Sequence, residues 1–313
     1  MKQSLLLGCG IVTLILSSCA SYKDATINHL VLSSKCNQQN LYSYTVADFP
    51  LPLQETTIDT LLKEKISVNS LLIANTIGII PYLNEYAKLK STPTKHSTIE
   101  QQLRLLELKQ VIYHYMSNAS LGISAVSSEL DCEDERVSQI ANYLTERESN
   151  IESKLTIGAI VLGATGGILS SGLIKNDNTS NTVAITTGIG EAALGLTMLF
   201  NKQKINFYHS RNVLKDIWEG PETSTLFPSF IWYYLNHEDD DKSSLRKEMI
   251  EKWVQFGQID DDSDNLADLY FKNGGKYTAD ELNNRANMYD QLETQVYLLK
   301  QKLMVLTSEI DNF

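Results

Sequence analysis

The chain has 313 residues, only six prolines and a formal net charge of −11 at neutral pH. An acidic balance of this size argues against nucleic-acid binding and against adhesion to anionic lipid head groups. Because apolar residues recur at helical spacing over long stretches, we predict an all-α fold with long helices in a bundle or coiled-coil arrangement, including an apolar Gly-rich helical hairpin.

The first 18 residues have the layout of a secretory signal. A positive charge near the start is followed by an uncharged run over residues 5–16, which is too short to span a bilayer. The run ends in an aliphatic residue, two small residues and a cysteine: Leu16-Ser17-Ser18-Cys19. This motif resembles the lipobox of bacterial lipoproteins. The alternative is an ordinary secretory signal whose cleavage releases a soluble protein.

The lipobox resemblance implies that Cys19 is acylated and becomes the N-terminus of the mature protein, with membrane lipid as its partner. Several acyl chains make such an attachment stable, because each buried methylene contributes about 0.8 kcal/mol. An Asp directly after the cysteine would resemble an inner-membrane retention signal, but Ala20 stands there. We therefore expect a lipid-anchored protein of the outer membrane, facing either the periplasm or the cell surface.

The same resemblance bears on the other cysteines. Cys9 would leave with the signal and Cys19 would carry lipid, so Cys36 and Cys132 would be the remaining thiols in an oxidising compartment. We predict a disulfide between them. Two buried, reduced thiols are the alternative.

The mature chain divides into four regions: a lipidated tether (19–54), a helical domain (55–154), an apolar hairpin (155–200) and a C-terminal helical region (201–313). In the tether we expect short strands around 30–31 and 42–46. In the helical domain we expect a helix over 58–89 that Pro81 kinks or ends, then a loop and two helices over 98–130 and 133–154.

The hairpin is the most unusual region. Its first arm, 155–174, carries no charge, and its second arm, 182–200, carries only Glu191. Twenty helical residues reach about 30 Å, the thickness of a bilayer core. Small residues recur every four positions, so we expect the arms to pack closely against each other or against other copies. These packing residues are Ala159, Gly163, Gly167 and Ser171 on the first arm and Ala184, Gly188 and Ala192 on the second.

Three interpretations of the hairpin remain open: a membrane-inserting helical hairpin, a helical hairpin buried in a soluble bundle or oligomer, and a Gly-rich β-hairpin. A charged Glu191 would cost a few kcal/mol in lipid. Its position therefore predicts protonation, a partner or a water-lined face in an oligomer.

In the C-terminal region we expect a helix over 205–218, an aromatic segment over 227–235 and a helix over 243–256. The aromatic segment suits a core better than a membrane interface. Gly274-Gly275 predicts a turn, and Thr278 with Glu281 predicts a capping box that opens the last helix.

The last helix has the clearest periodicity in the chain. Its seam follows alternating steps of three and four residues, which is typical of a coiled coil: Leu282, Arg285, Tyr289, Leu292, Val296, Leu299, Leu303, Leu306 and Ile310. We expect it to pair with the helix over 98–130 of the same chain. Pairing with a neighbouring subunit is the alternative.

Catalytic motifs are not apparent. Residues 188–193 match a dinucleotide fingerprint without its strand and helix context, and Asp260, Asp262 and Asp264 begin a calcium-loop spacing that the later positions do not complete. We predict no enzyme, cofactor or metal site. We expect instead an outer-membrane lipoprotein whose hairpin inserts in a membrane or drives self-assembly, as part of a pore or an envelope complex. The alternative is a periplasm-facing scaffold that binds a protein partner through its coiled-coil helix.

Overall fold

The computed structural model describes residues 27, 31, 34–37, 41–91, 98–168, 187–197, 202–209, 211–238, 243–259 and 264–313. The expected signal peptide, Cys19, Ser171 and Ala184 lie outside these residues. Where the chain is described, helices dominate and one two-stranded sheet accompanies them. The predicted all-α class is therefore confirmed.

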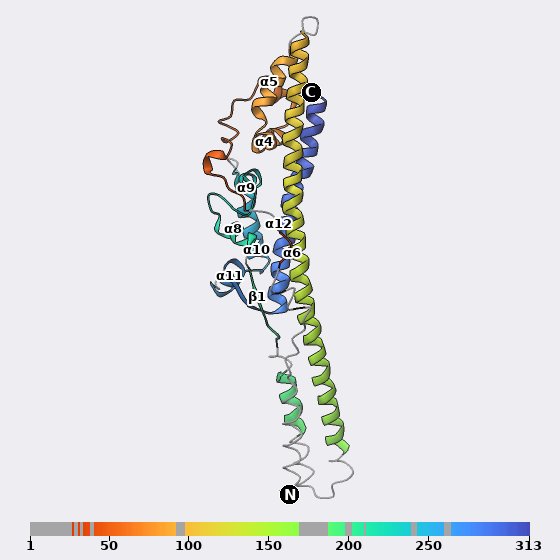
Figure 1. Cartoon of the computed structure of the whole chain (residues 1–313). Coiled ribbons are helices and arrows are strands. Elements are labelled where there is room, and N and C mark those ends of the chain that lie inside the picture. Colours follow the sequence, from red (N-terminus) through yellow and green to blue (C-terminus); the bar gives the residue numbers. More distant parts are fainter. Residues whose placement is uncertain are drawn as a thin grey trace.

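Two long antiparallel helices, α6 (Ile99–Ile168) and α12 (Ala279–Asp311), form the axis of the molecule (Figure 1). At 1.5 Å per residue, the 70 residues of α6 reach about 105 Å. The antiparallel order follows from Tyr113 near the start of α6, whose hydroxyl donates to Asp311 at the end of α12 over 2.5 Å. The predicted capping box of Thr278 and Glu281 opens α12.

The seam predicted for the last helix is buried at every position. Its partner is α6, so the predicted pairing within the chain is confirmed. The matching seam of α6 is also apolar, buried and spaced by three or four residues over most of its length: Leu108, Ile112, Met116, Ala119, Ile123, Val126, Leu130, Val137, Ile140 and Leu144. Burial of both seams in a single interface stabilises the two helices against each other.

The predicted break between residues 130 and 133 is wrong, because α6 runs through it without interruption. No Gly or Pro stands there, and the buried seam continues from Leu130 to Val137. The predicted helices over 98–130 and 133–154 and the start of the first hairpin arm are therefore one rod.

The predicted helix over 58–89 is three shorter helices: α3 (Thr60–Lys65), α4 (Val68–Thr76) and α5 (Ile80–Lys90). Pro81 is the second residue of α5 and does not end a helix. Backbone N–H groups in the first turn of a helix have no acceptor within the helix, so proline loses no hydrogen bond there. Its fixed φ also suits the helical conformation. Ser67 caps α4 by accepting a hydrogen bond from the backbone of Ser70.

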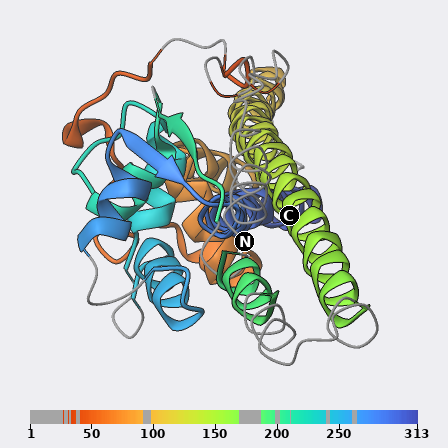
Figure 2. The same cartoon turned by 90° about the horizontal axis from the view of Figure 1, so that it is seen from below.

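Four further helices lie with α3 to α5 on one side of the α6–α12 pair (Figures 1 and 2). They are α8 (Val213–Glu219), α9 (Ser229–Asn236), α10 (Leu245–Gln255) and α11 (Asp264–Phe271). Helix α9 carries most of the aromatic segment, and Phe227, Trp232 and Tyr234 are buried. The prediction that this segment belongs to the core is confirmed.

The sheet pairs β1 (Ile205–Tyr208) antiparallel to β2 (Gly274–Tyr277). The predicted helix over 205–218 is therefore wrong in its first half, and the predicted turn at Gly274-Gly275 is part of a strand. Gly274 has a φ of 84°, and a Cβ there would overlap the carbonyl oxygen of Phe207. Only glycine permits this close approach of the two backbones.

Part of the predicted tether lies on the body. The backbone N–H of Tyr42 donates to the Thr225 carbonyl over 2.9 Å, and that of Ser224 donates to the Tyr44 hydroxyl over 3.0 Å. The strand expected over 42–46 is absent, since residues 41–45 are irregular and the short 3-10 helix η1 (Val46–Asp48) follows. Val31 is helical and not part of the strand expected around 30–31, and residue 30 lies outside the described residues.

Candidate functional site

The described parts of the hairpin project beyond the body (Figure 1). The first arm, 155–168, is the end of α6, and the second arm, 187–197, is a helix beside it. The β-hairpin interpretation is therefore wrong for these residues. The 188–193 segment that matches a dinucleotide fingerprint lies inside the helix of the second arm.

Glycines on α6 bring the two arms together. A Cβ on Gly166 would lie 2.5 Å from the Thr187 methyl carbon, and one on Gly163 would overlap the Glu191 carboxylate. A Cβ on Gly158 would make an ordinary contact with Leu194, 3.9 Å away. As the residue numbers increase along α6, the residue numbers of the facing positions on the second arm decrease, so the arms run antiparallel.

The contact only partly follows the small residues singled out in the sequence. Gly163 lies in the contact, whereas a Cβ on Gly167 or Gly188 would meet nothing within 4 Å. Ala159 is half-buried and Ala192 is exposed. The four-residue spacing missed Gly158 and Gly166, because the face that α6 turns to the second arm depends on how the arms dock.

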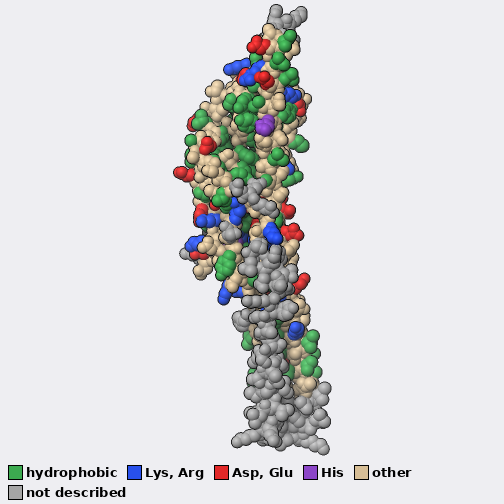
Figure 3. Space-filling model, in the orientation of Figure 1, with side chains coloured by type: hydrophobic (Ala, Val, Ile, Leu, Met, Phe, Trp, Pro, Cys, Tyr) green, Lys and Arg blue, Asp and Glu red, His purple; other side chains and the backbone are tan. Residues whose placement is uncertain are grey.

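The outer faces of both arms are apolar and exposed. Five aliphatic side chains expose between 54% and 64% of their surface: Ile157, Ile160, Val161, Ile189 and Leu196. Hydrophobic side chains gather on the projecting end of α6 (Figure 3). Large exposed apolar patches mark surfaces that contact lipid or protein. A helix long and apolar enough to cross a bilayer does not occur among the described residues.

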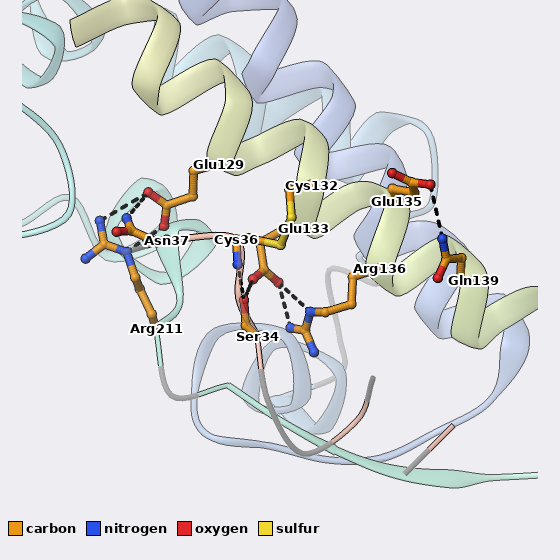
Figure 4. The surroundings of a disulfide bond; sticks show 10 residues. All are labelled: Ser34, Cys36, Asn37, Glu129, Cys132, Glu133, Glu135, Arg136, Gln139 and Arg211. Carbon is orange, nitrogen blue, oxygen red and sulfur yellow. Dashed lines mark hydrogen bonds and ion pairs between the residues drawn. A yellow bond between two sulfur atoms is a disulfide. The ribbon is translucent and has the colours of Figure 1, made fainter. Parts of the chain in front are cut away.

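A second notable site lies on α6 within the stretch that packs against α12. Cys36 and Cys132 form the predicted disulfide, with Cα atoms 5.4 Å apart (Figure 4). Residues 34–37, which we call the strap, cross α6 there. Glu129 and Glu133 flank Cys132 on α6, and each accepts a hydrogen bond from the strap, from Asn37 and Ser34 respectively.

Each of these carboxylates also meets an arginine. Arg136 Nη2 lies 2.6 Å from Glu133, and Arg211 Nε lies 2.5 Å from Glu129. Arg211 follows β1, so the ion pair connects the chain beyond the hairpin to the helix that carries the disulfide. Sequence reasoning missed Glu129 and Glu133, although their spacing around Cys132 places all three on adjacent turns of one helix.

The strap forms one wall of a cavity of about 470 Å³. Arg136, Arg211, Glu133 and His209 line its other walls. Burial, followed by the charges of Arg285 and Arg136, lowers the pKa of His209 to about 2. His209 is therefore neutral, and its Nε2 lies 2.8 Å from the hydroxyl oxygen of Tyr277, which donates in turn to the Leu269 carbonyl.

Arg285, the unusual member of the α12 seam, is fully buried beneath the sheet. It donates to the Tyr270 carbonyl over 2.6 Å, to Asn212 Oδ1 over 2.9 Å and to the Tyr289 hydroxyl over 2.8 Å. Neutral oxygens thus satisfy most of its donors. This network fixes the sheet to α12 at the base of the hairpin.

No known protein family, curated protein or solved structure matches this chain. Within the described ranges, no group of three or more His, Cys, Asp or Glu side chains is placed to hold a metal ion. Two features stand out: the exposed apolar arms, and the disulfide whose strap is hydrogen-bonded to Glu129 and Glu133.

Proposed function

We propose that this chain is a non-enzymatic lipoprotein of the outer membrane whose hairpin arms engage lipid. One observation carries the proposal: the arms project from the body and expose large aliphatic side chains on their outer faces. Exposed apolar surface of this kind is stabilised by transfer from water to an apolar phase, at roughly 25 cal/mol per Å². An acyl chain at Cys19 would hold the arms near a bilayer.

The scaffold alternative receives less support. A partner helix would need the apolar seam of the last helix, and that seam is already buried against α6. A partner could replace α6 only by unfolding the body.

Self-assembly through the hairpin is the second candidate function. Gly167 and Gly188 have open space where a Cβ would stand, and helix interiors with Gly are less stable than with Ala by about 1 kcal/mol. A close helix from another copy would give these two glycines a packing role.

A fluorophore that responds to polarity can separate these functions. We would attach it at Ile160→Cys in the full acylated chain, with Ser117→Cys on the exposed body side of α6 as the matched control. With zwitterionic lipid vesicles, emission from position 160 should shift to the blue, while emission from position 117 should not. A shift at 160 that needs only higher protein concentration, and no vesicles, would favour self-assembly. No shift under either condition, at about pH 7.5 and at about pH 5.5, would contradict both functions.

Anchoring is tested separately by Cys19→Ala. If Cys19 is acylated, the variant should lose the mass of the lipid and leave the membrane fraction. Unchanged mass and fractionation would refute the lipoprotein proposal.

A further inference from the structure

Glu191 is the single ionisable side chain on the two arms, 155–174 and 182–200. The structure places it at the contact between them. Its carboxylate lies against Gly163 of α6, in space that any side chain at position 163 would fill. Glu191 is therefore directed at the opposite arm and not away from the hairpin.

The surroundings of Glu191 on α6 offer no opposite charge. The α6 residues that face the second arm are glycines and Leu162, and nothing between residues 155 and 168 titrates. The second arm has no other ionisable group in its described range. The nearest charged residues along α6 are Lys154 and Glu152, both exposed. Lys154 is nine residues from Gly163, or about 13 Å along the axis, beyond a Debye length of about 8 Å in physiological salt.

In the structure Glu191 is exposed, so its carboxylate is accessible to water. Moving the outer faces of the arms into lipid would remove that water. A charged carboxylate without a partner is costly in lipid, whereas a neutral carboxyl group is much less so and also gains a hydrogen-bond donor.

We infer that protonation of Glu191 controls entry of the hairpin into lipid, an inference that rests on the proposed membrane function. The proton comes from solvent and stays on a carboxylate oxygen, and no other bond is made or broken. Gly163 provides the space in which the neutral carboxyl group lies between the arms. The hairpin therefore enters lipid more readily as the pH falls.

The test uses the full acylated chain, zwitterionic vesicles and the fluorophore at Ile160→Cys. Glu191→Gln keeps the shape of the side chain and removes the charge. The matched control, Glu152→Gln, removes one exposed acidic charge just outside the arms. Emission would be compared at about pH 7.5 and about pH 5.5, where most other carboxylates stay ionised.

The wild type and Glu152→Gln should shift to the blue mainly at the lower pH, and Glu191→Gln should shift at both. The insertion constant is the equilibrium constant for entry of the hairpin into lipid. Its value for Glu191→Gln divided by its value for the wild type should fall by close to tenfold for each unit by which the pH is lowered. Identical pH profiles for wild type and Glu191→Gln would overturn the inference and leave the proposed function standing. No shift in any variant at either pH would overturn both.

Discussion

Arg211 and Glu129 form an ion pair with Nε 2.5 Å from Oε1, and this pair joins the chain that follows the hairpin to α6. The two side chains expose only 19% and 10% of their surface. Arg211 also donates to the Leu226 carbonyl over 3.2 Å. One arginine thus connects α6, the segment after β1 and the loop before α9.

Replacing Arg211 with alanine should destabilise the protein strongly. The change leaves the Glu129 carboxylate mostly buried without its cation, which typically costs about 3 kcal/mol. Chemical unfolding would measure the loss. The matched control is Lys202→Ala, which breaks the exposed ion pair with Asp280 and should cost less than about 1 kcal/mol. Equal effects of the two changes would contradict the structural role of Arg211.

The disulfide should contribute a large share of the stability. Cys36 and Cys132 are 96 residues apart, and closing a loop of that length is worth about 4 to 5 kcal/mol in the chain-entropy model. A Cys36→Ser and Cys132→Ser double variant should unfold at lower denaturant concentration, as should the reduced wild type. An unchanged unfolding midpoint in either sample would contradict a stabilising role of the disulfide.

Two adjacent glycines on the first arm should respond in opposite ways. In Gly166→Ala the new methyl group would lie 2.5 Å from the Thr187 methyl carbon, so the arms must separate. In Gly167→Ala the methyl group meets nothing within 4 Å, and the higher helix propensity should stabilise the arm by up to about 1 kcal/mol. Hydrogen exchange of the arm amides should become faster in the first variant and slower in the second. Faster exchange in both would contradict the packing described here.

Because His209 is buried in its neutral form, the free energy of unfolding should decrease in acid. In the folded state its pKa is lowered to about 2, chiefly by burial, whereas an unfolded histidine titrates near about 6.5. Below the unfolded value only the unfolded chain takes up this proton, so the free energy of unfolding should decrease by up to about 1.4 kcal/mol per pH unit as the pH falls. His209→Gln should flatten this slope between about pH 6 and about pH 4. His114→Gln, at an exposed position, is the control and should leave the slope unchanged.

Periodicity and capping were sufficient to predict α12. Its seam and its first residue follow from the spacing of apolar residues and from Thr278 with Glu281. Pairing with α6 was one of two open alternatives, and the structure decided it. The disulfide could also be predicted, because the lipobox resemblance implies that Cys9 and Cys19 are not free thiols, which leaves one possible pair. These features are local or have few alternatives.

Tertiary structure decided the rest. Residues 205–208 are too few to separate helical from strand periodicity, and they form a strand because Gly274 lets β2 approach Phe207. The glycines that join the arms depend on how two helices dock, which spacing on either arm alone does not fix. The hydrogen bonds from Asn37 and Ser34 of the strap to Glu129 and Glu133 join positions more than ninety residues apart. Contacts of this kind arise only when the chain is folded, because no local pattern encodes which distant charges will meet.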